Sequence, residues 1–264
     1  MNSDFKYIIT FIYRPEKSPF KIVVESKEGI ASALQTASVL EKYFKILSLE
    51  MNRAASESPV VRVTYFAEAL SNDLDITKTT NDILSSLPGI SCELIPGHGE
   101  LLLDGRFPIL LSSGAQGMII PSKAFQAMVD IVRGTYGSGG EAIVYRTGFE
   151  SGMQMAKTAS KVLGRGNFNI CYLMNEYAVL GHGRPEIVSH NEESGAMVVR
   201  LWGNVECMDH KSITPFSQFT RGHLCGFLST LMERDFTCEE IKCIATGAEY
   251  CQFKLVPISS KISA

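Results

Sequence analysis

The stretch SQFTRGHLCGFLSTLMERDFTCEEIKCIATGAEYCQF, from Ser217 to Phe253, holds the most informative residue spacing of this 264-residue chain. It predicts a helix, a strand, a turn at Gly247 and a second strand. Glu240, Cys243 and Cys251 flank that turn, and partner residues of a hairpin lie about 5 Å apart. A carboxylate and two thiols are donors that zinc prefers. The spacing therefore predicts three ligands of one metal site.

The sequence alone does not decide which group is the fourth ligand. The candidates are Ser217, a water, Cys225 and His223, and the last two are two positions apart on a helix, so they cannot both face one site. The alternative is that the thiols are reduced and pack as small apolar groups.

The second half of the chain carries three blocks in order: YRTGFESG at 145–152, TRGHLCGFLSTL at 220–231 and CEEIKCIATGAEYCQFKLV at 238–256. Together they resemble the 4-vinyl-reductase-like domain over about residues 105–256. That resemblance implies a mixed α/β fold, related to vesicle-tethering subunits and nitric-oxide-sensing modules, that senses small apolar molecules and often holds a structural zinc. Zinc-binding members carry a cysteine five residues before the first helix glycine, where this chain has Ser217. Because a serine hydroxyl is a poor zinc ligand beside thiolates, we expect little or no bound zinc.

Aromatic and methionine side chains are frequent in the same half. The resemblance implies that several of them line an internal apolar cavity, as in most small-molecule sites. The predicted ligand contacts are Tyr172, Trp202, Phe216 and Phe219. The alternative for each residue is a place in the ordinary hydrophobic core.

The first half predicts the order β-α-β-β-α-β, typical of a ferredoxin-like unit in an α+β protein. Predicted strands at 20–25, 46–51, 60–66 and 90–95 and predicted helices at 30–44 and 75–87 give this order, and a further predicted strand covers 5–13.

The segment SKEGIASALQTASVLEKYFKILSLEM, residues 26–51, resembles the opening of an ACT domain, an amino-acid-sensing regulatory module. In that family the loop that holds Gly29 lines the effector site, often across a dimer interface. Gly29 is therefore a candidate amino-acid contact, and the alternative is a glycine that merely allows a tight turn.

The breakers at 96–99, PGHG, predict a boundary between an ACT-like domain at 1–97 and a 4-vinyl-reductase-like domain at 98–264. Asp104-Gly105 predicts a hairpin turn between flanking apolar runs. Thr214-Pro215 predicts the first residues of the last helix.

Composition excludes several classes of protein. A net charge of −3 argues against a nucleic-acid binder, and no apolar run approaches the ~18 residues of a membrane span. The N-terminus lacks the layout of a signal peptide, and an odd count of seven cysteines suits a reducing cytoplasm. Two Gly-x3-Gly motifs, at 148–152 and 222–226, allow close helix packing, and a homodimer interface is one use of such motifs.

Signals for catalysis are weak. Cys207 and His210 could meet in a turn, but no third group that would orient them is evident. The chain also lacks a nucleotide fingerprint. We therefore expect a cytoplasmic, non-enzymatic sensor that binds a small apolar or aromatic molecule and acts through an unknown protein partner. The alternatives are an enzyme or accessory of tetrapyrrole vinyl reduction and a structural adaptor without ligand.

Overall fold

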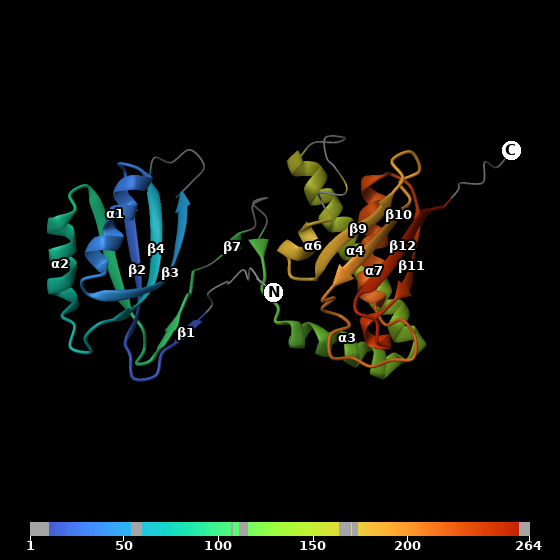
Figure 1. Cartoon of the computed structure of the whole chain (residues 1–264), viewed down its shortest axis with the longest axis horizontal. Coiled ribbons are helices and arrows are strands. Elements are labelled where there is room, and N and C mark those ends of the chain that lie inside the picture. Colours follow the sequence, from blue (N-terminus) through green and yellow to red (C-terminus); the bar gives the residue numbers. More distant parts are fainter. Residues whose placement is uncertain are drawn as a thin grey trace. The chain divides into compact units, whose positions relative to one another are not determined.

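The computed structural model describes residues 11–53, 60–106, 108–110, 116–163, 170 and 174–258. The chain divides into two compact units, Met1–Phe107 and Pro108–Ala264. Both units combine helices with antiparallel sheets (Figure 1).

The main sheet of unit 1 has the strand order β3-β4-β2-β5, and all neighbouring strands are antiparallel. Its elements follow the chain in the order β2 (Pro19–Ser26), α1 (Ile30–Leu40), β3 (Phe44–Arg53), β4 (Val61–Ala69), α2 (Ile76–Ser86) and β5 (Ile90–Pro96). The sheet is therefore laid out as β-α-β-β-α-β, with β4 and β2 at its centre.

Alternation along β2 explains why this strand forms. Phe20, Ile22 and Val24 are buried, while the residues between them are partly exposed. Helix α1 packs on the same core, where the Tyr65 hydroxyl lies 2.8 Å from the Thr36 hydroxyl and donates to a carbonyl of the helix. This core is built from residues of unit 1.

The end of unit 1 differs from two expectations. The predicted hairpin around Asp104-Gly105 is wrong: β6 (Leu101–Leu103) pairs with β1 (Phe11–Tyr13), and β7 (Ile109–Leu110) pairs with β8 (Gln116–Gly117). Arg106 binds both Asp104 and Glu50, each at 2.6 Å, which ties this segment to the sheet. Unit 1 thus extends about ten residues beyond the boundary that we expected at 97.

Unit 2 places helices against a second antiparallel sheet of order β11-β12-β10-β9. The helices are α3 (Ser122–Tyr136), α4 (Ser138–Leu163), α6 (Glu176–Val179) and α7 (Gln218–Leu231), with a short 3-10 turn η1 (Ile244–Thr246). The strands are β9 (Arg184–His190), β10 (Met197–Trp202), β11 (Phe236–Lys242) and β12 (Cys251–Pro257). Burial alternates along β10, so one face of the sheet meets the helices and the other is partly exposed.

Helices α4 and α7 touch along a seam of four glycines. A Cβ added to Gly222 would lie 2.0 Å from the carbonyl oxygen of Tyr145, and one added to Gly148 would lie 2.1 Å from that of Phe219. Gly152 and Gly226 make equally close approaches. Both Gly-x3-Gly motifs therefore face each other within one chain, and they offer no support for a dimer interface.

Helix α7 begins at Gln218, so the predicted start at Thr214-Pro215 is wrong. The carboxylate of Glu206 accepts the first backbone N–H groups of the helix, from Phe219 at 2.9 Å and Thr220 at 2.8 Å. Those N–H groups have no partner inside a helix. A residue distant in sequence thus caps α7 in place of a local one.

Candidate functional site

A cluster of thiols and a carboxylate lies at one end of the unit 2 sheet. Glu240, Cys243 and Cys251 come together as their spacing predicts, and Cys207 joins them. One ligand atom from each residue lies within 4.8 Å of all the others, and all four residues are buried. Cys207 was not among the predicted fourth ligands, so the structure adds the member that sequence reasoning missed.

A tight turn after β10 brings Cys207 into the cluster. Gly203 adopts a φ of 63°, a conformation that favours glycine, and the N–H of Cys207 donates to the carbonyl of Asn204 at 3.0 Å. Cys207 and His210 do meet in this turn, where the N–H of His210 donates to the carbonyl of Cys207 at 3.2 Å, but their side chains have other partners. The imidazole of His210 instead contacts the Asp130 carboxylate at 3.0 Å.

The two helix residues considered as fourth ligands point elsewhere. The Cys225 thiol donates to the carbonyl of Phe236 at 2.8 Å, and His223 Nδ1 shares a hydrogen bond with the Tyr177 hydroxyl. Neither residue reaches the cluster.

Ser217 lies inside the cluster and holds its carboxylate. The Ser217 hydroxyl donates to Oε1 of Glu240 at 2.6 Å, and the Ser217 N–H donates to Oε2 at 2.9 Å. The same hydroxyl oxygen is 2.9 Å from the sulfur of Cys207. Burial raises the pKa of Glu240 to about 8, since a charge is costly in this environment.

Each sulfur of the cluster also accepts hydrogen bonds from N–H groups. The side-chain amide of Asn204 points at Cys207 (3.6 Å) and Cys251 (3.5 Å). Backbone N–H groups reach the other side, from Phe216 to Cys243 and from Ile244 to Cys251, both at 3.4 Å. Such donors stabilise sulfur that carries negative charge, so the donor set and its surroundings fit a zinc ion.

An ion pair borders this cluster. Arg133 of α3 lies 2.8 Å from the Glu206 carboxylate, which is fully buried, and its guanidinium lies 3.8 Å from the centre of the Phe216 ring. Glu206 also caps α7 and is the neighbour of Cys207 in sequence. The cluster, the ion pair and the first turn of α7 therefore form one connected structure.

A second group of side chains follows along α7. Phe219 and His223 of that helix meet Phe125, Tyr177 and His182, with ring centres between 5.1 and 6.2 Å apart. We call these five residues the aromatic cluster. Burial lowers the pKa of His223 to about 3 and lowers that of His182 as well, so both imidazoles are neutral. The cluster is thus apolar in bulk and carries a few uncharged polar atoms.

The structure brings together only some of the predicted ligand contacts. Phe219 belongs to the aromatic cluster, whereas Phe216 stacks on His210 at a ring separation of 4.5 Å. Trp202 lies on the partly exposed face of the sheet, where its indole donates to Glu186 at 3.0 Å. Tyr172 lies outside the described residues.

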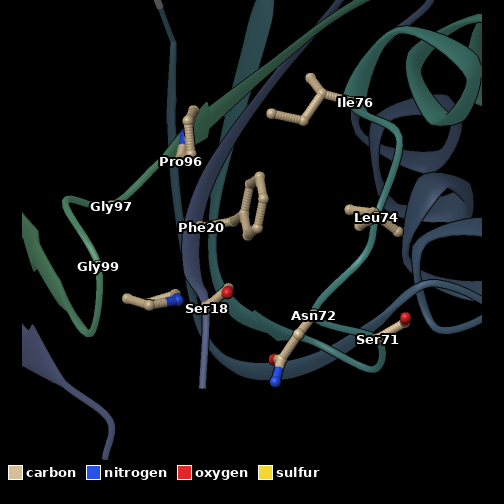
Figure 2. A pocket seen from close by; sticks show the side chains of 10 residues that line it. Ser18, Phe20, Ser71, Asn72, Leu74, Ile76, Pro96, Gly97 and Gly99 are labelled. Carbon is tan, nitrogen blue, oxygen red and sulfur yellow. The ribbon is translucent and has the colours of Figure 1, made fainter. Parts of the chain in front are cut away.

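Gly29 lies between β2 and α1 with a φ of 103°, and a Cβ there would meet no atom within 4 Å. The positive φ supports its role in the turn. A pocket of about 220 Å³ lies at the other end of β2 (Figure 2). Phe20, Leu74 and Ile76 point toward one another there, and Gly97 closes one side. Gly29 is not part of this pocket.

Comparison with known proteins identifies unit 2. The profile of the vinyl-4-reductase domain, abbreviated V-4-R, matches residues 197–257. An uncharacterized protein of Methanocaldococcus jannaschii is 31% identical over 149 residues, which cover 55% of this chain and 80% of that protein. Unit 2 therefore contains a vinyl-4-reductase domain.

Two solved structures resemble this chain. The phenol-responsive sensory domain of the transcription activator PoxR, solved with phenol, superposes with a TM-score of 0.50 at 18% identity and covers 54% of this chain and 77% of its own. A vinyl-4-reductase family protein from Methanocaldococcus jannaschii gives a TM-score of 0.41 at 20% identity, over 54% of this chain and 84% of its own.

The described helices of this vinyl-4-reductase domain protein include none with the length and apolar character that a membrane span needs.

Proposed function

We propose that this vinyl-4-reductase domain protein is a cytoplasmic regulatory sensor whose C-terminal unit binds a small aromatic molecule. The aromatic cluster carries this proposal, because it gathers apolar rings and neutral polar atoms around the buried side chains of Tyr177 and His223. Small-molecule sites are built in this way, with mostly apolar walls and a few polar groups that orient the ligand.

The chemistry of the cluster favours an aromatic ligand with a hydroxyl group. His223 and Tyr177 are each 2% exposed, and the hydrogen bond between them leaves further donor and acceptor capacity on both groups. A neutral imidazole accepts a hydrogen bond from a phenol hydroxyl without placing a charge in the core. The similarity in fold to a phenol-responsive sensory domain supports the same ligand class.

For unit 1 we propose a ferredoxin-like, ACT-like regulatory role, with an amino acid as its effector. The β-α-β-β-α-β order and the glycine turn before α1 support this assignment. We further propose a homodimer, since closed two-fold dimers are the commonest oligomers. Light scattering would measure the dimer, and calorimetric titration of the intact protein with amino acids would reveal the effector. A monomer that binds none of them would remove both proposals.

Isothermal titration calorimetry of the full chain with phenol, catechol and cyclohexanol tests the main proposal. We expect the aromatic alcohols to bind and cyclohexanol to bind at least tenfold more weakly. Tyr177→Phe and His223→Leu should each weaken phenol binding by roughly tenfold or more, since one lost hydrogen bond to a buried polar group costs about 1–3 kcal/mol.

Trp202→Phe is the matched control, because it changes an aromatic side chain on the partly exposed face of the unit 2 sheet, outside the aromatic cluster. It should leave phenol affinity unchanged. If none of the three alcohols binds, or if Trp202→Phe weakens binding as much as Tyr177→Phe, the aromatic cluster is not the ligand site.

A further inference from the structure

We infer that this chain holds one zinc ion through Cys207, Glu240, Cys243 and Cys251, and that Cys207 takes over the role of the thiol that zinc-binding relatives carry at the position of Ser217. The inference is independent of the proposed function. It also reverses the expectation of little or no zinc, which assumed that only three good ligands were present.

The dimensions of the cluster match a tetrahedral site. A zinc–sulfur bond of about 2.3 Å places two sulfurs of one tetrahedron about 3.8 Å apart. The sulfurs of Cys207 and Cys243 are 3.6 Å apart, and no pair of ligand atoms in the cluster exceeds 4.8 Å. The four groups thus already stand near the positions that a single zinc ion requires, and side-chain shifts of about 1 Å would close the longest gaps.

The chemical types of the four donor groups favour zinc over other metal ions. Three thiolates and one carboxylate form a soft, anionic set that suits zinc, whereas Mg²⁺ and Ca²⁺ take oxygen ligands. All four residues are buried, and several ionised groups in such a place require a cation to offset their charge. The N–H groups of Asn204, Phe216 and Ile244 point at the sulfurs, as the outer partners of metal ligands do.

Ser217 acts as a positioning residue in this site. Its hydroxyl donates to Oε1 of Glu240 and its backbone N–H donates to Oε2, so Ser217 fixes the orientation of the carboxylate. A hydroxyl that donates its proton in this way is a neutral and hard oxygen, and it competes poorly with the nearby Cys207 sulfur for zinc.

A zinc ion at this place would also join distant segments. Cys207 comes from the turn after β10, and the other three ligands come from the β11–β12 hairpin. The same turn carries Asn204 and Glu206, which hold the Ser217 hydroxyl and the first turn of α7. Zinc binding would therefore stabilise the start of the helix that bears Phe219 and His223.

The test uses the full chain produced in zinc-supplemented medium, with metal content measured by mass spectrometry. We expect about one zinc per chain in the unmodified protein and in the control Cys225→Ser, whose thiol bonds to the Phe236 carbonyl outside the site. Cys207→Ser should lower zinc content at least fivefold. Cobalt(II) exchanged into the unmodified protein should show sulfur-to-metal charge-transfer absorption of a strength that indicates three thiolates, and Cys207→Ser should reduce it to that of two.

A swapped variant keeps the inference testable if Cys207→Ser fails to fold. The double change Cys207→Ser with Ser217→Cys returns a thiol to the relatives' position, and it should restore both zinc content and the three-thiolate absorption. Unmodified protein that takes up no zinc or cobalt would overturn the inference. So would a folded Cys207→Ser variant that keeps full zinc and an unchanged cobalt spectrum, because another group would then be the fourth ligand.

Discussion

Replacement of Gly222 by alanine should destabilise unit 2 strongly, although alanine is the better helix former. The new Cβ would lie 2.0 Å from the Tyr145 carbonyl oxygen, whereas ordinary contact begins at 3.4 Å. Helices α4 and α7 must therefore separate by more than 1 Å. Overpacking of this kind costs about 1–3 kcal/mol and at times more, and alanine recovers only about 1 kcal/mol through helix propensity. Because separation would also loosen the contacts at the three other seam glycines, we expect a net loss of about 3 kcal/mol.

The single tryptophan of the chain, Trp202, lies on β10 and makes the measurement specific to unit 2. Urea unfolding followed by its fluorescence should show the loss as a lower midpoint at an unchanged slope. The midpoint of thermal unfolding should fall by roughly 6–12 °C for a unit of this size.

Gly134→Ala is the matched control. Gly134 lies inside α3, and a Cβ there would meet no atom within 4 Å. This change should stabilise unit 2 by about 0.5–1 kcal/mol. If Gly222→Ala stays within about 0.5 kcal/mol of the unmodified protein while Gly134→Ala shows its gain, the close packing of α4 on α7 is refuted.

Two further predictions concern buried charge in unit 2. Burial is the main cause that lowers the pKa of His223 to about 3, and the nearby His182 is the second cause. The unfolded chain therefore binds a proton at this imidazole more readily than the folded chain does. As a result, the free energy of unfolding decreases as the pH drops below about 6.5. Between pH 7.5 and pH 5 the unmodified protein should lose about 2 kcal/mol more than His223→Gln in urea unfolding, and equal losses would contradict the assignment. Arg133→Met should cost about 3–5 kcal/mol because it leaves the buried Glu206 carboxylate without its cationic partner. Adding Glu206→Gln should recover part of that loss in the same assay, and strictly additive losses would show that the two side chains do not interact.

Sequence reasoning succeeded where short-range spacing decides the contact. Glu240, Cys243 and Cys251 surround one turn of one hairpin, so their spacing alone brings them together. The four seam glycines were recognised as sites of close helix packing, because a missing side chain has this use wherever it occurs on a helix. Sequence spacing could not name the partner helix, and the structure shows that it belongs to the same chain.

The wrong predictions of local structure involve contacts with residues that are distant in sequence. Asp104-Gly105 has the composition of a hairpin turn, but salt bridges from Arg106 to Asp104 and to Glu50 hold this segment against the sheet of unit 1 instead. Thr214-Pro215 has the composition of a helix start, but the Glu206 carboxylate reaches the N–H groups of a later turn. In both places a tertiary contact prevailed over a local preference.

The amino-acid sequence by itself therefore determined the vinyl-4-reductase character of unit 2, three members of the thiol and carboxylate cluster, and the positions where helices pack closely. Only the tertiary structure decided that Cys207 completes the cluster and that Ser217 donates hydrogen bonds to the Glu240 carboxylate. It also decided that Trp202 lies away from the aromatic cluster. The physical reason is that spacing along the chain determines which residues meet within one helix turn or across one hairpin. Cys207 lies 36 residues before Cys243, and the packing of the whole unit brings their sulfurs within 3.6 Å of each other.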